Sequence, residues 1–332
     1  MGENRKMRMV KGKSKQGTDC YKFEVVFQGN LKNLPKQPLT NKQGKKYGTV
    51  EVKDGKATVA LVLPKYIRKT NVQPFTLMDS IYLEIIKNDC EKQLKHLLGA
   101  ELESKIKSIE CNITQRVSGQ ATQSDVLNLL NHALLNPERD NLKYVGASKE
   151  CRCKEEIHTV IARKPHYYII KAYDKTAQQK MERKNQKKDT STVPNGLLRI
   201  EIIMVERTLE NLFGNKTSFF DILTEKSLIE ILREYKRIFC DEIIDIQVKR
   251  YLNFCVLHLV ESLCETETPF ATIAKERELI PDTEVLRRAL ERWQKIRGVS
   301  DNSLRDSKHY AQKYELPQNV ILTLHDFKKS CG

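Results

Sequence analysis

The period of the apolar residues changes near residue 215, and this change limits the fold more than any other feature. Before it, strand-like segments such as LLRIEIIMVE (197–206) alternate with helical ones. After it, apolar residues recur at the helical spacing, as in SFFDILTEKSLIEILREYKRIF (218–239). A chain of 332 residues is also long enough for two domains. We therefore predict an α+β domain over residues 21–215 and an all-helical C-terminal domain over residues 216–332.

Positive charge is concentrated in the first part of the chain. The net charge is +15; residues 1–210 contain 39 Lys and Arg against 24 Asp and Glu, whereas residues 211–332 contain 19 of each. Cations confined to one region are typical of a protein that binds a phosphate backbone, because each neutralised phosphate releases a counterion. A basic protein with flexible lysine-rich tails has the same composition. In either case we expect residues 1–20 to be a basic flexible arm.

The sequence argues against several other classes of protein. The longest apolar run, YLNFCVLHLV (251–260), is half of the roughly 20 residues that a membrane span needs. The basic N-terminus lacks the apolar core of a secretory signal. The nine cysteines have no repeated spacing, and Cys151, Cys153 and His158 lack the paired Cys-x-x-Cys pattern of a structural zinc site. We predict a cytoplasmic protein with reduced thiols and no membrane contact.

A tyrosine flanked by cations lies on one predicted strand, HYYIIKAYDK (166–175). Side chains alternate along a strand, so Lys171, Tyr173 and Lys175 share one face. Such a tyrosine is able to act as a nucleophile, but strand tyrosines more often pack against the sheet with the hydroxyl in water. Both interpretations of Tyr173 stay open on this pattern alone.

Two other predicted strands each carry a carboxylate. Glu110 lies in SIECNIT (108–114), and Glu201 shares a face with Arg199. A bare carboxylate in an apolar strand is costly unless it is paired or binds a cation. Two such groups suit Mg²⁺ or Mn²⁺, which prefer oxygen ligands. The alternative is a salt bridge to Arg199 or Lys171 without any metal.

Three segments resemble the rolling-circle replication initiators of filamentous phages, the gene II/X family of phage replication proteins, and their plasmid relatives. They are SIECNIT, YIIKAYDKTAQ, and NGLLRIEIIMVERTLENLFG followed by SFFDIL, in the same order and at similar spacing over residues 108–222. The last segment, with its Arg-x-Glu strand and terminal Phe-Gly, is the most specific. The chain departs from the family at two points: Glu110 stands where Asp is usual, and no His-x-His pair occurs.

The resemblance implies an HUH-like antiparallel sheet nuclease domain. Tyr173 would be the nucleophile with Lys175 beside it, and Glu110 and Glu201 would help to hold Mg²⁺ or Mn²⁺. A phenol has a pKa near ~10, so it needs nearby positive charge or an organised base to react at neutral pH. The implied function is site-specific nicking and rejoining of one DNA strand through a 5′-phosphotyrosyl intermediate, which initiates rolling-circle replication. The implied partners are origin DNA, single-stranded or supercoiled, and the host helicase and polymerase.

Two further segments are candidates for DNA contact. In TAQQKMERKNQKKDTSTVPNG (176–196), a solvated loop is the alternative to a backbone-tracking segment. FATIAKERELIPDTEVLRRALERWQKI (270–296) has the outline of a helix-turn-helix, although plain helical packing is commoner. The candidate cations are Lys180, Arg183, Lys184, Lys187 and Lys188 in the first segment, Arg287, Arg288 and Arg292 in the second, and Lys171 on the tyrosine strand.

Two other functions fit the same residues. A conjugative relaxase or a transposase would use the same tyrosine chemistry on a transfer origin or an element end. A non-catalytic origin-binding protein would bind DNA without forming a covalent complex. The DNA substrate separates the first alternative from a replication initiator, and the covalent complex separates the second.

Overall fold

The computed structural model describes residues 15–26, 31–68, 73–99, 103–134, 143–144, 152–153, 156–157, 159–214, 218–266 and 268–331. Its centre is a nine-stranded sheet in the order β2-β3-β4-β1-β5-β11-β10-β9-β6, and every neighbouring pair is antiparallel. The predicted α+β class with an antiparallel sheet is confirmed. The strands are β1 (Lys15–Val26), β2 (Leu34–Thr40), β3 (Lys46–Lys53), β4 (Lys56–Leu61), β5 (Glu103–Arg116), β6 (Lys143–Tyr144), β9 (Thr159–Lys164), β10 (Tyr168–Asp174) and β11 (Leu197–Val205), with a separate pair β7 (Arg152–Cys153) and β8 (Glu156–Ile157).

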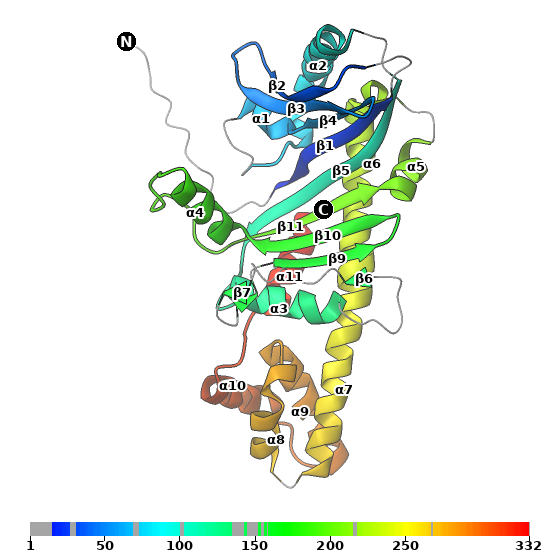
Figure 1. Cartoon of the computed structure of the whole chain (residues 1–332). Coiled ribbons are helices and arrows are strands. Elements are labelled where there is room, and N and C mark those ends of the chain that lie inside the picture. The colour runs from blue at the N-terminus through cyan, green and yellow to red at the C-terminus, as the bar shows by residue number, and fades with distance from the viewer. Residues whose placement is uncertain are drawn as a thin grey trace.

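The described chain is helical from residue 218 onward, as predicted. The elements α6, η4 and α7 follow one another as one long helical rod, and α8, α9 and α10 gather at its far end (Figure 1). The helices are α1 (Leu63–Ile67), η1 (Leu77–Tyr82), α2 (Leu83–Leu98), α3 (Gln123–Leu134), α4 (Lys175–Asn185), α5 (Glu206–Phe213), η3 (Phe219–Ile222), α6 (Glu225–Lys236), η4 (Arg237–Val248), α7 (Lys249–Glu265), α8 (Pro269–Lys275), η5 (Arg277–Leu279), α9 (Thr283–Arg297), α10 (Ser303–Tyr314) and α11 (Val320–Ser330).

One face of the sheet forms the core. The apolar positions of β11 that include Ile200 and Ile202 are buried, and the Tyr235 hydroxyl of α6 donates to the carbonyl of Ile200 at 3.1 Å. Helices α6 and α11 lie behind the sheet in Figure 1. Because side chains alternate along β11, Arg199 and Glu201 point to the opposite face.

The C-terminal helices are tied back to the sheet. The backbone N–H of Ser118 donates to Thr323 Oγ1 at 2.9 Å, and the Ser118 hydroxyl donates to Asp326 Oδ2 at 2.7 Å. Helix α11 therefore returns from the helical cluster to the end of β5. The predicted boundary at residues 215 and 216 separates a part that contains both strands and helices from a part that is helical in the described chain, and hydrogen bonds cross this boundary.

The structure bears on two predictions about the first half of the chain. Residues 1–14 of the predicted arm lie outside the described residues, whereas residues 15–20 belong to β1 and pair with β5 from Lys15 opposite Thr114. The arm is therefore wrong over 15–20, because sheet pairing overrides the basic composition there. Cys151 and His158 lie outside the described residues. Among the helices that the structure describes, none is long and apolar enough to cross a membrane.

Glu242 of η4 joins the β9–β10 hairpin, which contains Tyr168, to the helical rod of α6, η4 and α7. Its carboxylate accepts hydrogen bonds from Tyr168 Oη at 2.6 Å, Arg237 Nη1 at 2.6 Å and Lys164 Nζ at 3.0 Å. Burial alone would raise the pKa of Glu242, but these three donors favour the carboxylate and hold its pKa below the ordinary value. The stabilisation is therefore present above the unfolded pKa of about 4.3 and is lost as the pH falls through the lower folded pKa.

We predict that Glu242→Gln lowers the free energy of unfolding at pH 7 by about 1–3 kcal/mol, because three donors lose their charged acceptor. The loss should shrink at acidic pH, below the lowered pKa of the native carboxylate, where that group is protonated as well. Urea denaturation at both pH values measures it. Asp241→Asn, at an exposed position of η4, is the control and should change little. An equal loss at both pH values would contradict the electrostatic origin.

Candidate active site

Tyr173 lies near the end of a central strand. Along β10, Tyr168, Ile170 and Ala172 are buried, whereas Lys171 and Tyr173 are only partly buried on the other face. Strands β9 and β11 pair with β10 on its two sides. The strand stops at Asp174, whose carboxylate caps α4 by accepting from Ala177 N at 2.8 Å. Rigid elements therefore fix the position of the tyrosine.

The antiparallel register arranges one face of β10, β11 and β5 in rows. We call this the polar face, and its rows from β10 through β11 to β5 are Tyr173–Arg199–Thr114, Lys171–Glu201–Asn112 and Ile169–Ile203–Glu110. The structure thus brings Tyr173, Lys171 and Glu201 together as direct or diagonal neighbours. Glu110 is on the same face, diagonal to Glu201. The predicted sharing of one face by Lys171 and Tyr173 is confirmed.

Glu201 contacts the tyrosine hydroxyl directly. Tyr173 Oη donates to Glu201 Oε1 at 2.5 Å, and Arg199 Nη1 lies 3.9 Å from the same oxygen. Glu201 is 6% exposed and Arg199 is 0% exposed, and Arg199 Nε donates to Thr114 Oγ1 at 2.7 Å. The salt bridge that the sequence left open therefore exists. The hydrogen bond from tyrosine to glutamate is a feature that the sequence did not predict.

The two lysines beside Tyr173 differ in their surroundings. Lys175 is 2% exposed as the first residue of α4, with Nζ 5.5 Å from the centre of the Tyr173 ring. Its ammonium also donates to Gln178 Oε1 at 2.9 Å. Lys171 stands opposite Glu201 across the strands, and it has no hydrogen-bond or ion-pair partner within the described ranges. Positive charge of this kind stabilises negative charge that develops on a phenol oxygen.

The donor groups of the polar face fit Mg²⁺ or Mn²⁺. Diagonal neighbours across a sheet lie about 7–8 Å apart, which is within reach of two glutamate side chains that bind one ion. Asn112, in the row of Glu201 and next to the row of Glu110, is fully buried, and its amide oxygen accepts from Thr114 Oγ1 at 3.4 Å. The part of the chain that the structure describes contains no group of three or more His, Cys, Asp or Glu residues that would hold a metal. Mg²⁺ commonly takes one or two carboxylates and completes its shell with water and phosphate.

The segment after the tyrosine strand begins as a helix. The loop alternative for residues 176–196 is wrong over its first part, because α4 runs from Lys175 to Asn185 and projects from the end of β10 and β11 (Figure 1). Of the predicted DNA contacts, Lys184, Lys187 and Lys188 are exposed. They remain available to a ligand.

Three cations of this segment have hydrogen-bond partners within it, and one of them is Lys188, whose Nζ donates to Gln186 Oε1 at 2.8 Å. Lys180 Nζ donates to Asn195 Oδ1 at 3.1 Å. Arg183 is half-buried and donates to the carbonyl of Asp189 at 2.9 Å and to the hydroxyl of Thr192. Arg183 therefore stabilises the turn that follows α4.

The candidate helix-turn-helix consists of α8, η5 and α9. Arg287 Nη2 lies 2.7 Å from Glu284 Oε1, within the same helix, and Arg288 Nη2 donates to Asn253 Oδ1 of α7 at 3.2 Å. Arg292 is exposed. The contacts of Arg287 and Arg288 favour packing as their role.

The comparisons with known proteins give a distant structural likeness. No protein-family model matches the chain, and no curated protein matches its sequence. The chain is similar to the solved structure of a rolling circle replication initiator protein from Geobacillus stearothermophilus, with 12% identity and a TM-score of 0.33 over 68% of this chain and 84% of that one. A likeness of this extent assigns neither a family nor a function, so function rests on the residues of the polar face.

Proposed function

We propose that this chain is a metal-dependent DNA nickase and strand-rejoining enzyme that initiates rolling-circle replication, with Tyr173 as its nucleophile. The observation that carries the proposal is the 2.5 Å hydrogen bond from Tyr173 Oη to the buried carboxylate of Glu201. Tyr168 donates to a carboxylate as well, but it is buried and supports the fold, whereas Tyr173 is only partly buried on the polar face. The Tyr173 hydroxyl has a proton acceptor in Glu201, and Lys175 lies beside the ring. The resemblance of segments in 108–222 to the gene II/X family points to the same chemistry.

The residues of the polar face divide the reaction among them. Glu201 Oε1 accepts the proton of Tyr173 as Oη forms a bond to phosphorus. The bond from phosphorus to the 3′ oxygen breaks, the 3′ oxygen takes a proton from solvent water and leaves as a hydroxyl, and the 5′ phosphate stays on the tyrosine. Attack by a 3′-hydroxyl on the phosphotyrosine reverses these steps and rejoins the strand. Lys175 offsets negative charge near the ring.

The carboxylates of Glu110 and Glu201 and the amide oxygen of Asn112 are the groups that would hold Mg²⁺ or Mn²⁺. When bound, the ion supplies Lewis-acid polarisation of the scissile phosphate. The two carboxylates would also keep the metal on the face that Tyr173 occupies. We assign the metal to this face because its oxygen donors are the type that hard divalent cations select.

DNA would approach along the polar face and α4. Lys171 on the face and the exposed Lys184, Lys187 and Lys188 are placed to contact phosphates, with Lys180 reachable once it leaves Asn195. After nicking, the free 3′-hydroxyl would prime a host polymerase while a host helicase separates the strands. A relaxase or transposase would carry out the same chemical steps on a transfer origin or an element end.

The test uses supercoiled DNA that carries the gene for this chain and its upstream region. With Mn²⁺ or Mg²⁺, we expect nicked circles with protein covalently attached, and no nick in the presence of a chelator. Primed synthesis from the nick would identify a replication origin as the substrate. Specific binding without an adduct would overturn the proposal in favour of a non-catalytic origin-binding protein.

A further inference from the structure

A groove of about 690 Å³ lies between the beginning of β5, the β9–β10 turn and α5. Three exposed cations line it, and none of them has a hydrogen-bond or ion-pair partner among the residues that the structure describes. Apolar side chains line it as well. The cations are Lys105, Lys107 and Arg163, and the apolar residues include Ile106, Ile169, Leu209 and Phe213.

The groove continues the polar face away from α4. Ile169 and Arg163 stand opposite each other across β10 and β9, and Ile169 lies on the Tyr173 side of β10. Tyr173 is four positions along the strand from Ile169, which corresponds to roughly 13 Å. A strand of nucleic acid with its scissile phosphate at Tyr173 would therefore pass α4 on one side and this groove on the other.

A bulge in β5 contributes to the positive charge of the groove. The pairing of β1 with β5 shifts so that Ser108 and Ile106 oppose consecutive residues of β1, which leaves Lys107 as the extra residue. Bulges of this kind redirect side chains at the edge of a site. Lys105 and Lys107 both line the groove as a result.

The wall between the β9–β10 turn and α5 is fixed by hydrogen bonds. Arg207 N donates to the carbonyl of His166 at 2.9 Å, and the His166 ring lies 2.5 Å from the Glu206 carboxylate. His166 and Glu206 have φ angles of 65° and 22°, which non-glycine residues rarely adopt. Such conformations persist where the surroundings over-determine them, often at ligand sites. The groove is therefore preformed.

The acidic residues of the lining do not cancel its positive charge. Glu206 is engaged with His166, and Glu210 stands one helical turn along α5. Lys164, a fourth cation of the lining, is already paired with Glu242 at 3.0 Å. The three unpaired cations therefore outnumber the two carboxylates of the lining, and the excess positive charge is available to an anionic ligand.

We propose that this groove binds unpaired nucleotides of the DNA strand that Tyr173 cuts. The three cations suit backbone phosphates, and the apolar surface suits the faces of unstacked bases. A duplex would satisfy the cations but keep its bases away from the apolar surface. An acidic peptide would lack planar groups for that surface. That the bound strand is the one that Tyr173 cuts rests on the proposed function. That the groove binds single-stranded DNA does not rest on it.

The test is the salt dependence of single-strand binding by the full chain. We would measure fluorescence anisotropy of a labelled oligothymidine of about 12 nucleotides, without divalent metal and in the Tyr173→Phe background, so that cleavage plays no part. Each phosphate contact contributes about 0.7 to the slope of log affinity against log salt concentration for single strands. Lys105→Ala/Lys107→Ala/Arg163→Ala should therefore reduce this slope by about 2.

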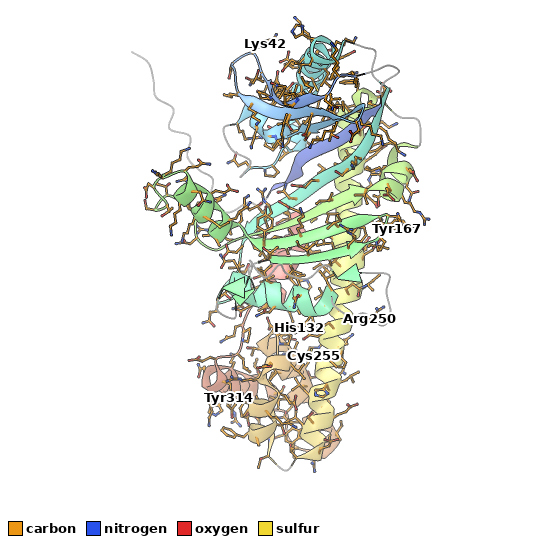
Figure 2. All side chains as sticks on the ribbon, viewed as in Figure 1. Lys42, His132, Tyr167, Arg250, Cys255 and Tyr314 are labelled. Carbon is orange, nitrogen blue, oxygen red and sulfur yellow. The ribbon has the colours of Figure 1, made fainter. Side chains whose placement is uncertain are left out.

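The control removes the same charge elsewhere. Lys42→Ala/Lys46→Ala/Lys65→Ala changes three exposed lysines around β2, β3 and α1, and Figure 2 shows Lys42 at the upper end of the molecule, away from Tyr167. The salt-dependence slope of this control variant should equal that of the protein with an unaltered groove. If both triple variants lose the same slope, or neither does, the proposal is overturned.

Phe213→Ala tests the apolar surface separately. Stacking of one base corresponds to about a 5- to 150-fold change in affinity. We expect such a loss for the oligothymidine, no loss for a duplex of equal length, and an unchanged far-ultraviolet circular dichroism spectrum. Equal losses for both ligands, or tighter competition by oligoglutamate than by oligothymidine, would overturn the proposal. None of these measurements depends on nicking. Failure of the nickase proposal would therefore appear in the nicking experiment and not in these binding measurements.

Discussion

Replacing Tyr173 by Phe should abolish covalent attachment to DNA and lower the nicking rate by at least about 10³-fold. Phenylalanine keeps the ring beside Lys175 and removes the oxygen that donates to Glu201. The loss is therefore expected in the chemical step and not in DNA affinity. Single-turnover nicking of end-labelled DNA, with denaturing electrophoresis of the adduct, measures it.

The matched control is Tyr167→Phe on the same hairpin. Tyr167 lies at the other end of β10 from α4 (Figure 2), and its hydroxyl accepts from Arg207 Nη1 at 3.4 Å. Tyr168 is not a suitable control, because its hydroxyl bonds to Glu242 and supports the fold. Tyr167→Phe should nick and form adduct at the unaltered rate. Full activity of Tyr173→Phe together with loss in Tyr167→Phe would move the nucleophile to Tyr167.

Glu201→Gln should lower the nicking rate by about 10²–10⁴-fold, the usual size of an acid–base contribution. Glutamine keeps the side-chain length and an oxygen that accepts from Tyr173, but it does not take up the proton and binds a divalent cation weakly. The deficit should become smaller as the pH rises toward about 10, where a tyrosine phenol ionises without a base. The pH dependence of single-turnover nicking measures this.

Glu110→Gln separates the metal role from the proton role. Glu110 shares the polar face but stands one row from Glu201, opposite Ile203. We expect this variant to need a higher Mn²⁺ concentration for half-maximal nicking. Its nicking rate should rise with pH by the same factor as that of the unaltered protein. Identical behaviour of Glu110→Gln and Glu201→Gln would contradict the separate assignment of proton acceptance to Glu201.

The alternation of side chains was sufficient to predict that Lys171 and Tyr173 share the polar face. Period 2 along HYYIIKAYDK places Lys171 and Tyr173 together, and the structure confirms this. The rows themselves depend on the register between strands, which is set by tertiary pairing. For that reason the sequence left Glu201 as a metal ligand or a salt-bridge partner, and the hydrogen bond from Tyr173 to Glu201 was not predicted.

Two local predictions differ from the structure because the conformation at these positions depends on contacts with other residues. Lys175 lies beside Tyr173 as predicted, yet it belongs to α4, because Asp174 caps a helix at the point where a longer strand was expected. Residues 15–20 were predicted as an arm on their basic composition, while pairing with β5 makes them part of a strand. Composition and local pattern do not contain these tertiary contacts.

The most direct test of the central claim is to map the residue that carries the DNA. Trypsin cuts after Lys171 and Lys175, so Tyr173 leaves in the peptide AYDK, whereas Tyr167 and Tyr168 leave in a different peptide. After nicking with Mn²⁺, nuclease digestion and mass spectrometry, we predict a nucleotide on AYDK, linked through its 5′ phosphate. A nucleotide on the peptide that contains Tyr167 and Tyr168, or nicked DNA without any peptide adduct, would contradict the account.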